Sequence, residues 1–348
     1  MAIYTIYLLV VFNMKKIALL FGGRTDEHDV SVNSARYLGH LFQKLNYPVT
    51  YYYFDKDNIP YKTKLEEILS TIDTTYIKSI ALNDFIKELA TSVAFPLGFG
   101  RFAEDGKLYA LLEMYQVPTL GGPYNSNVIS FDKLFTKYFL CARNYPTLNY
   151  KHYSFAQLTR SQIINQIKRD FTPPIILKPR FNGSSIGISV VRSFKNNHLD
   201  KSVDLIKAVD DDMLCEPFIT HHREFQIGII KQKDQVHFSE IGELVYDSEF
   251  LDIEEKFSVN STCKYQVPQS LSLSIFNQVR SLTQNIMQEL QLNSYLRMDY
   301  LYNPNNDVLY VNEISPMFGL TEKSGFWQLW QLQKQSDLET LQMIIDSV

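Results

Sequence analysis

The chain has 348 residues, of which 45% are hydrophobic and 21% charged, an ordinary composition for a soluble globular protein of two or three domains. The formal net charge of −4 argues against a nucleic-acid-binding protein, which usually carries a basic patch. Cys141, Cys215 and Cys263 are scattered and odd in number, which suits neither a disulfide framework nor a C-x-x-C zinc site and fits a reducing compartment.

Residues 1–13 are apolar but too few to span a bilayer, which takes about 20 apolar residues. A signal peptide carries its positive charges before the apolar run, whereas Lys15 and Lys16 follow it here. We therefore interpret residues 1–13 as an upstream extension or a misassigned start, with a membrane anchor as the less favoured alternative.

The N-terminal third predicts a strand, a glycine turn, a helix and a second strand, which together form a βαβ unit. Residues 17–21 and 49–54 are the apolar strand candidates, and an amphipathic helix lies between them. The glycine turn lacks G-x-G-x-x-G, so a dinucleotide site is poorly supported. Glu27 stands near the start of the helix, where the helix dipole alone favours an acidic group.

Residues 173–191 predict a strand that ends near Lys178, a loop rich in glycine and serine, and a second strand. Small residues let backbone N–H groups approach an anion closely, and the hydroxyls of Ser184 and Ser185 add donors. A lysine that projects from a strand suits a phosphate contact. The Walker sequence G-x-x-x-x-G-K-[ST] is absent, and the loop alone is a weak signal for phosphate binding.

A long amphipathic helix is expected over residues 269–290, followed by a β-hairpin whose turn is rich in asparagine and proline. A fold-back about residue 306 places Asp299 opposite Glu313. Opposed carboxylates are destabilising and require a counter-charge. Either a divalent cation such as Mg²⁺ or the neighbouring Arg297 would supply it.

The same register places Arg297 opposite Ser315, on the face that carries the two carboxylates. The R-x-D and N-E-I sequences of this hairpin, and the G-x-T-x-x-S sequence at 319–324, resemble the metal-binding and substrate-binding end of the D-alanine–D-alanine ligases, which belong to the ATP-grasp superfamily. Residues 22–35 and 96–122 resemble two further signatures of this family. The resemblance covers nearly all of residues 14–348, with its motifs in the family's order.

The resemblance implies an α/β and α+β fold, namely an ATP-grasp fold preceded by a Rossmann-like βαβ domain. The expected divisions are an N-terminal domain at 14–125, a central ATP-grasp subdomain at 126–213 and a C-terminal ATP-grasp subdomain at 214–348. The last would hold the metal and substrates, and ATP would bind between the last two.

The resemblance also implies roles for single residues around the two substrates. Glu27 would hold the ammonium group of the first D-alanine, and Ser184 would link the nucleotide and substrate sites. Arg297 and the backbone of Gly319 would stabilise the tetrahedral oxyanion. Ser324 would contact the carboxylate of the second substrate.

For ATP, the resemblance implies that the adenine meets the segment around Glu216, that Glu224 binds the ribose, and that lysines bind the phosphates. The expected ATP-binding residues are Lys133, Lys178, Ser184, Ser185, Glu216, Pro217, Phe218, Ile219, Glu224 and Lys256. Lys133, at the start of a helix expected over 130–140 with Asp132 in its first turn, would otherwise be a surface lysine. Asp299, Glu313 and Ser315 would ligate Mg²⁺, or Mn²⁺ in its place.

The chain departs from the family pattern at several positions. Phe99 replaces a histidine near the first-substrate pocket, and the loop at 220–223 is one residue longer than the commonest spacing. Phe257 replaces a tyrosine of the first-substrate network, a loss worth about 0.5–1.5 kcal/mol for one neutral hydrogen bond. In the family, phenylalanine at this position is associated with D-lactate as second substrate. Ser315 replaces an asparagine and Phe318 a proline, and we expect Ser315 to weaken Mg²⁺ binding.

The sequence therefore predicts an ATP-dependent ligase that joins two D-alanines through a D-alanyl phosphate for peptidoglycan synthesis in the cytoplasm. A ligase of D-alanine to D-lactate or another acceptor is the first alternative, and a nucleotide-binding protein with weak catalysis is the second. The expected partners are small molecules, without nucleic acid or membrane. A homodimer is common in the family, but no feature of the sequence decides it.

Overall fold

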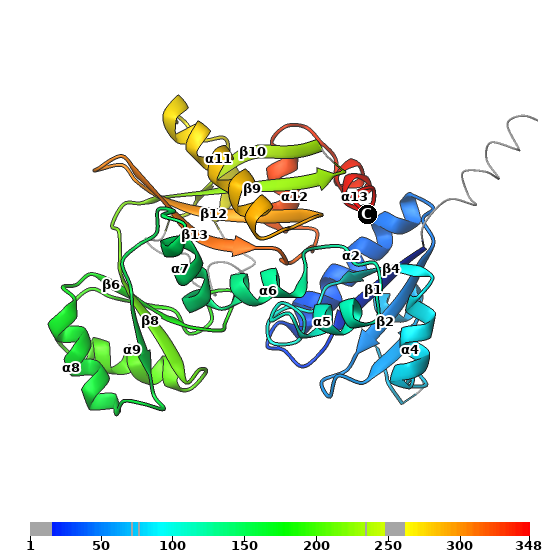
Figure 1. Cartoon of the computed structure of the whole chain (residues 1–348), viewed down its shortest axis with the longest axis horizontal. Helices are drawn as coiled ribbons and strands as arrows, with labels where there is room; N and C mark the ends of the chain where they lie inside the picture. The colour runs from blue at the N-terminus through cyan, green and yellow to red at the C-terminus, as the bar shows by residue number, and fades with distance from the viewer. Residues whose placement is uncertain (1–15, 71, 76, 234, 248–261) are drawn as a thin grey trace, which may run out of the picture.

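The computed structural model describes residues 16–348, except for residues 71, 76, 234 and 248–261 (Figure 1). Three β-sheets, each covered by helices, organise this part of the chain. The combination of a largely parallel sheet with two antiparallel ones agrees with the predicted α/β and α+β class. Of the helices described, none has both the length and the apolar character that a membrane crossing requires.

The N-terminal sheet has the strand order β3-β2-β1-β4 and is parallel except for its edge strand β3. Its central strands are almost wholly buried, which is why they read as continuous apolar runs. The predicted βαβ unit is confirmed as β1, α2 and β2. The elements of this part are β1 (Lys16–Gly22), α2 (His28–Lys44), β2 (Val49–Phe54), β3 (Pro60–Thr63), α3 (Leu65–Leu69), α4 (Leu82–Leu89), β4 (Ser92–Pro96) and α5 (Lys107–Met114).

Two helices link this part to the central sheet. The helix expected over 130–140 is in fact divided, because Asp132 has an extended backbone and caps a new helix with hydrogen bonds from two backbone N–H groups. Lys133 is consequently the first residue of that helix. The two helices are α6 (Tyr124–Phe131) and α7 (Lys133–Ala142).

The central sheet is antiparallel, with the order β5-β8-β6-β7. Two helices pack on one face through buried isoleucine, leucine and valine side chains and form a separate core with the strands. The elements are β5 (Lys151–Ser154), α8 (Arg160–Asp170), β6 (Ile175–Pro179), β7 (Ser189–Val191), α9 (His198–Lys207) and β8 (Asp212–Pro217). The boundary expected between residues 213 and 214 falls inside β8, and we propose that the C-terminal subdomain begins after Pro217.

The C-terminal sheet has the order β11-β10-β9-β12-β13 and is antiparallel. The long helix expected over 269–290 begins only at Leu273, because the Ser272 side chain accepts a hydrogen bond from the Ile275 N–H and caps it. The elements are β9 (Arg223–Gln232), β10 (Gln235–Val245), β11 (Lys264–Gln266), α11 (Leu273–Glu289), β12 (Tyr295–Asn303), β13 (Val308–Ser315), α12 (Gly325–Gln331) and α13 (Asp337–Ile345).

The last two helices connect the C-terminal sheet to the N-terminal sheet. Aromatic side chains of α12 belong to the same buried cluster as β1 and β4. The Tyr37 ring on α2 packs edge-on against Trp327, and the Ser34 hydroxyl accepts a hydrogen bond from the Leu320 N–H at 3.0 Å. Figure 1 shows α13 next to α2. The two sheets are therefore joined through one buried cluster, whereas the rest of the C-terminal sheet packs against α11 in a second core and the central sheet has a third.

Candidate active site

The hairpin of β12 and β13 has the predicted register at its functional end. Asp299 pairs with Glu313, and Arg297 pairs with Ser315. Side chains of one strand that are two residues apart point to the same face. The two strands thus bring a cation, two carboxylates and a hydroxyl to one face.

Arg297 supplies a counter-charge to Asp299, with Nε 2.7 Å from Oδ1 and Nη2 2.9 Å from Oδ2. Burial opposes the guanidinium charge, but Asp299 and Glu313 outweigh it and raise the pKa of Arg297. Gln226 Nε2 donates to Asp299 Oδ2 at 2.9 Å, and the Tyr265 hydroxyl donates to Gln226 Oε1 at 2.6 Å. Asp299 is therefore held in place by a chain of polar groups that reaches β11.

The donor set around Asp299 and Glu313 fits Mg²⁺. Ser315 Oγ donates to Glu313 Oε1 at 3.0 Å, so its oxygen lies beside a carboxylate. Over the described residues, no group of three or more histidine, cysteine, aspartate or glutamate side chains is placed to hold a metal ion. Mg²⁺ commonly takes one or two carboxylates and completes its shell with water and phosphate oxygens, and this site can offer that number.

Lys178 is fixed by a buried carboxylate. Its Nζ lies 2.9 Å from Glu216 Oε2, and Lys137 Nζ lies 2.8 Å from Glu216 Oε1. Burial raises the pKa of Glu216, but the two ammonium groups lower it overall to about 2. The Glu216 carboxylate is therefore charged, and it holds Lys178 at the end of β6.

A β-bulge brings Lys178 into contact with the hairpin. After Asp299 and Glu313 the pairing shifts by one residue, so that Tyr300 pairs with Val311 and Asn312 is the extra residue. Bulges next to active sites commonly redirect a side chain. Here the Asn312 side-chain oxygen accepts a hydrogen bond from Lys178 Nζ at 3.3 Å.

Glu27 and the glycine-serine loop are in direct contact. The Ser184 hydroxyl donates to Glu27 Oε1, across 157 positions of sequence. A Cβ on Gly183 would lie 3.1 Å from Glu27 Oε2, so the loop backbone also approaches the carboxylate closely. Ser184 and Ser185 have φ angles of 50° and 62°, in the left-handed region. The two segments expected to bind the first substrate and the phosphates therefore meet.

Lys133 is half-buried and contacts the same loop. Its Nζ donates to the Asn182 carbonyl, and its backbone N–H donates to the Arg180 carbonyl at 3.2 Å. Burial lowers the pKa of Lys133. The lysine predicted to bind a phosphate thus lies at the loop, where it holds the loop backbone.

Glu104 is a buried carboxyl near Glu27. The Gly100 N–H donates to its Oε2 at 3.0 Å. Burial, together with the charge of Glu27, raises the pKa of Glu104 to about 8. Its carboxyl is therefore largely protonated at neutral pH, while Lys133 and Glu313 lie within electrostatic range.

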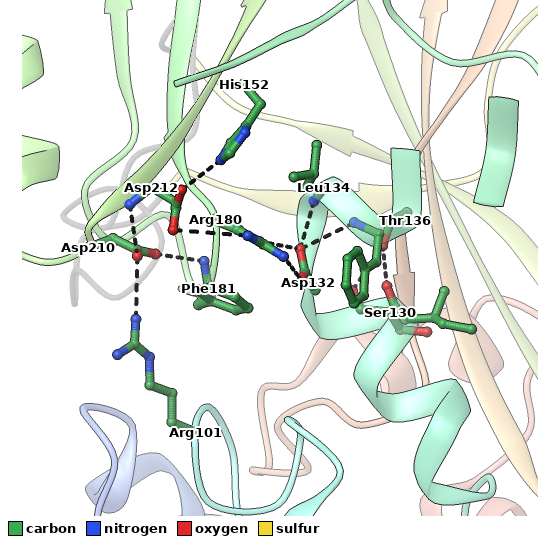
Figure 2. A network of polar contacts seen from close by, with 12 residues as sticks. Arg101, Ser130, Asp132, Leu134, Thr136, His152, Arg180, Phe181, Asp210 and Asp212 are labelled. Atoms are coloured by element: carbon green, nitrogen blue, oxygen red, sulfur yellow. Dashed lines mark hydrogen bonds and ion pairs between the residues drawn. The ribbon is translucent and has the colours of Figure 1, made fainter. Parts of the chain in front are cut away.

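A polar network anchors the start of the loop on both sides, as Figure 2 shows. Arg180 forms two hydrogen bonds with the carboxylate of Asp132, the cap of α7. Asp210, which is 7% exposed, accepts from the Phe181 N–H at 2.8 Å. Arg101, from the segment between β4 and α5, reaches Asp210 at 3.5 Å. The network ties the N-terminal part, α7 and the central sheet together at the glycine-serine loop.

The segment expected to meet adenine and ribose continues from β8. Pro217 ends the strand and Phe218 is buried. The Ile219 carbonyl accepts a hydrogen bond from His222 Nδ1 at 2.7 Å, and His222 Nε2 lies 3.0 Å from Glu224 Oε1. One histidine therefore connects the adenine-side backbone with the carboxylate expected to bind ribose.

The residues expected to bind the second substrate lie just before α12. A Cβ on Gly319 would lie 3.6 Å from Ser324 Oγ, and Ser324 Oγ lies 3.1 Å from Thr321 Oγ1. The Phe318 ring stacks on Phe326 and lies 5.6 Å below the Arg297 guanidinium. Phe318 thus packs beneath the predicted oxyanion-binding cation.

Comparison with known proteins decides the family. Residues 16–122 match the family model described as the N-terminus of D-Ala–D-Ala ligase, and residues 139–345 match that of its C-terminus. The chain belongs to the D-alanine–D-alanine ligase family. A D-alanine–D-alanine ligase of Halothermothrix orenii is 30% identical over 328 residues, which are 91% of this chain and 93% of that protein. One of Prochlorococcus marinus is 29% identical over 334 residues, 91% of this chain and 94% of that protein.

Solved structures of this family have the same fold. The D-alanine–D-alanine ligase of Helicobacter pylori gives a TM-score of 0.76 at 25% identity, over 96% of this chain and 99% of that one. The VanG D-Ala:D-Ser ligase of Enterococcus faecalis gives 0.80 at 21% identity, over 97% and 100%. The predicted family and its ATP-grasp fold are confirmed.

The structure shows the surroundings of three residues at which this chain departs from the ligase pattern. Phe99 is buried in the N-terminal core, Phe318 packs under Arg297, and Ser315 bonds to Glu313. Lys256 and Phe257 lie outside the described residues. Their roles stay predictions.

Several residues that shape the ligase site were not among the predicted site residues. Glu104 stands in a motif that the sequence does show, and Lys137 follows Lys133 by four positions, on the same helix face. Most of the others have partners that are distant in the chain and so carry no local sequence signal, whereas Asp132 and His222 also contact residues two or three positions away. The unpredicted residues are Arg101, Glu104, Asp132, Lys137, Asp210, His222, Gln226, Tyr246, Tyr265 and Asn312.

Proposed function

We propose that the protein is an ATP-dependent ligase that joins two D-alanines. The observation that carries the proposal is the contact of Ser184 with Glu27, which brings the phosphate loop onto the residue expected to bind the first substrate's ammonium group. Lys133 holds the same loop from below. A nucleotide phosphate and the first amino acid would thus be positioned side by side.

The proposed reaction has two steps. A carboxylate oxygen of the first D-alanine attacks the γ-phosphorus of ATP, which releases ADP and leaves a D-alanyl phosphate. The neutral amine of the second D-alanine then attacks the acyl carbon, and phosphate leaves. Positioning and charge stabilisation are the main work of such a site.

Each charged group has a place in this scheme. Lys133 and Lys178 would bind phosphate oxygens, and Lys178 is held for this by Glu216. Arg297, with the Gly319 backbone, would stabilise the oxyanion of the second step. Mg²⁺, held by Asp299, Glu313 and Ser315, would neutralise phosphate charge, a role for which Mn²⁺ can substitute.

The first two candidates differ in the acceptor, the molecule to which the first D-alanine is joined. A ligase that uses D-lactate as the acceptor is the second candidate. Phe257 motivates it, because phenylalanine at this position of the family is associated with D-lactate. A nucleotide-binding protein with weak catalysis is the third candidate. The retained carboxylates and lysines, and their mutual contacts, count against it. The product would serve peptidoglycan synthesis in the cytoplasm, where ATP is supplied.

The test is phosphate release by the purified chain with ATP, Mg²⁺ and D-alanine, followed by the same assay with D-lactate or D-serine added. Mass spectrometry identifies the product. The proposal expects D-alanyl-D-alanine as the main product at neutral pH in each mixture. If a mixed product dominates when D-lactate or D-serine is present, the protein is instead a ligase of D-alanine to that acceptor. No phosphate release in any mixture would reject ligase activity.

A further inference from the structure

His222 lies in the loop between β8 and β9, which is one residue longer than the commonest spacing in the family. Its side chain is 6% exposed. Nδ1 lies 2.7 Å from the Ile219 carbonyl oxygen, and Nε2 lies 3.0 Å from Glu224 Oε1. Both ring nitrogens therefore face hydrogen-bond acceptors.

This geometry constrains the protonation of the ring. Neutral imidazole carries one N–H and can donate to only one acceptor, whereas imidazolium carries two. A carbonyl oxygen always accepts, so both contacts are satisfied when His222 is doubly protonated and Glu224 is charged. Burial lowers the pKa of His222, but Glu224 and the Ile219 carbonyl raise it overall.

Charged groups of several elements lie near this pair. Lys178 on β6 opposes protonation of His222. The Phe218 ring stands edge-on to the imidazole at 5.6 Å, and the Arg192 guanidinium lies 5.9 Å from that ring. Among the described residues, the Arg223–Glu243 ion pair and the Tyr246 hydroxyl just after β10 line a cavity together with His222.

Glu224 borders a cavity of about 210 Å³, together with Arg223, Glu243 and Tyr246. Its Oε1 receives two hydrogen bonds, from His222 and from the Tyr246 hydroxyl at 2.6 Å. Two donors on one oxygen fix the plane of the carboxylate. The second oxygen, Oε2, is thereby oriented as well.

We propose that His222 is a positioning residue, which in its doubly protonated form holds Glu224 in the orientation that binds the ribose hydroxyls of ATP. The proposal rests on the proposed function, since it takes Glu224 as the ribose-binding residue. It adds a pH-dependent control of nucleotide affinity, exerted through the extended loop of this chain.

The direction of the pH effect follows from the hydrogen bonds. Below the pKa of His222, the ring holds both the Ile219 carbonyl and Glu224. Above it, one N–H must serve two acceptors, so one contact is lost and Glu224 is less constrained. We expect the Kd for ATP to rise about tenfold, equivalent to about 1.4 kcal/mol, as the ring loses its proton.

The experiment measures the Kd of the full chain for MgATP and for the Mg²⁺ complex of 2′,3′-dideoxy-ATP by calorimetry between pH 6 and pH 9. The two nucleotides share their triphosphate, so its own titration cancels in the comparison. The affinity for ATP should weaken with rising pH more than that for the dideoxynucleotide. A role of His222 in folding alone would change both nucleotides equally.

Three variants sharpen the test. His222→Gln should weaken ATP binding at low pH and remove the difference in pH dependence between the nucleotides. Tyr246→Phe deletes the other donor to Glu224 and should weaken ATP binding at every pH. The difference in pH dependence between the two nucleotides should remain. His221→Asn is the matched control, because His221 is exposed with φ of 57°, which asparagine tolerates, and it should keep the wild-type difference.

Equal pH dependence for the two nucleotides, or a pH difference that persists in His222→Gln, would overturn the proposal. Phosphate release with D-alanine is measured in parallel. If the chain shows the predicted pH difference but releases no phosphate, the role of His222 is supported and the ligase function is rejected. If the wild-type chain binds neither nucleotide, both the role of His222 and the ligase function are rejected.

Discussion

Glu104 is a half-buried residue whose carboxyl group is largely protonated at neutral pH. The pKa of this group is about 8 in the folded chain, whereas an unfolded glutamate titrates near 4.5. Between these values the folded state binds the extra proton, so the free energy of unfolding falls as the pH rises through this window and levels off above it. Glu104 is also within electrostatic range of Glu27, so its proton keeps a second negative charge away from the residue expected to bind the first substrate.

We therefore expect Glu104→Gln to be more stable than the wild type at pH 9 but not at pH 5. The gain at pH 9 should be at least ~2 kcal/mol, because one unit of raised pKa corresponds to about 1.4 kcal/mol. Urea unfolding at pH 5, 7 and 9 measures it. The exposed Glu113→Gln is the control. Parallel stability curves for wild type and Glu104→Gln would contradict the expectation.

Arg297 is the second residue whose role can be isolated. It is bound by Asp299 and stands over Phe318, so its position does not depend on substrate. Arg297→Ala should still bind ATP but lose about 10²–10³ in the rate of ligation, the usual loss when an oxyanion-stabilising donor is removed. Arg297→Lys keeps the charge without the forked geometry and should recover little activity. Calorimetric ATP binding and product formation are measured together, and unchanged turnover in Arg297→Ala would remove the oxyanion assignment.

At the scale of elements, the hairpin of β12 and β13 carries the residues of the proposed metal site. Its strands present only two carboxylates, and Ser315 is a poorer fixed ligand than the asparagine of the family pattern. Glu313→Gln should raise the Mg²⁺ concentration for half-maximal phosphate release by roughly tenfold, while Ser315→Asn should lower it. A Mg²⁺ titration of both variants checks this. Identical titrations in both would argue against a metal at this hairpin.

The same hairpin shows what the sequence can predict. A symmetric fold-back about residue 306, inferred from the turn formers at 303–307, predicted that Asp299 faces Glu313, and the pairing of the strands confirms it. The bulge at Asn312 was not predictable from this pattern, since the extra residue is selected by its contact with Lys178, 134 positions away. The contact of Tyr265 with Gln226 likewise arises only when β9, β10 and β11 are assembled.

The sequence predicted the presence of two helices correctly but not where each of them begins. Ser272 and Asp132 are both good caps, and they set the true starts of α11 and α7, which amphipathic patterns alone placed too early. The spacing of Lys133 and Lys137 by four residues could have indicated that Lys137 faces the site with its neighbour. Its partner, the buried Glu216, follows only from the tertiary packing.

At the scale of the whole molecule, one buried cluster joins the N-terminal sheet, α12 and the Ile230 and Tyr295 side chains of the C-terminal sheet. The rest of the C-terminal sheet forms a second core with α11, and the central sheet has a third. Phe326→Ala should therefore destabilise β1, β4 and β12 together, by about 3–5 kcal/mol for a fully buried phenylalanine. Hydrogen exchange followed by mass spectrometry should show faster exchange in peptides of these strands. Peptides of β6 and β8 should keep their wild-type local protection. Equal loss in all three sheets would show that the molecule unfolds as one unit.

The shared core also has a consequence for folding during synthesis of the protein. The N-terminal sheet leaves the ribosome first, yet the aromatic side chains of Phe326 and Trp327 that complete its core are made near the end of the chain. At synthesis rates of about 5–20 residues per second, the nascent sheet would keep that apolar surface uncovered for on the order of 10–40 s. Chaperones that bind emerging chains would have their longest opportunity here, and a translational pause before α12 would lengthen it.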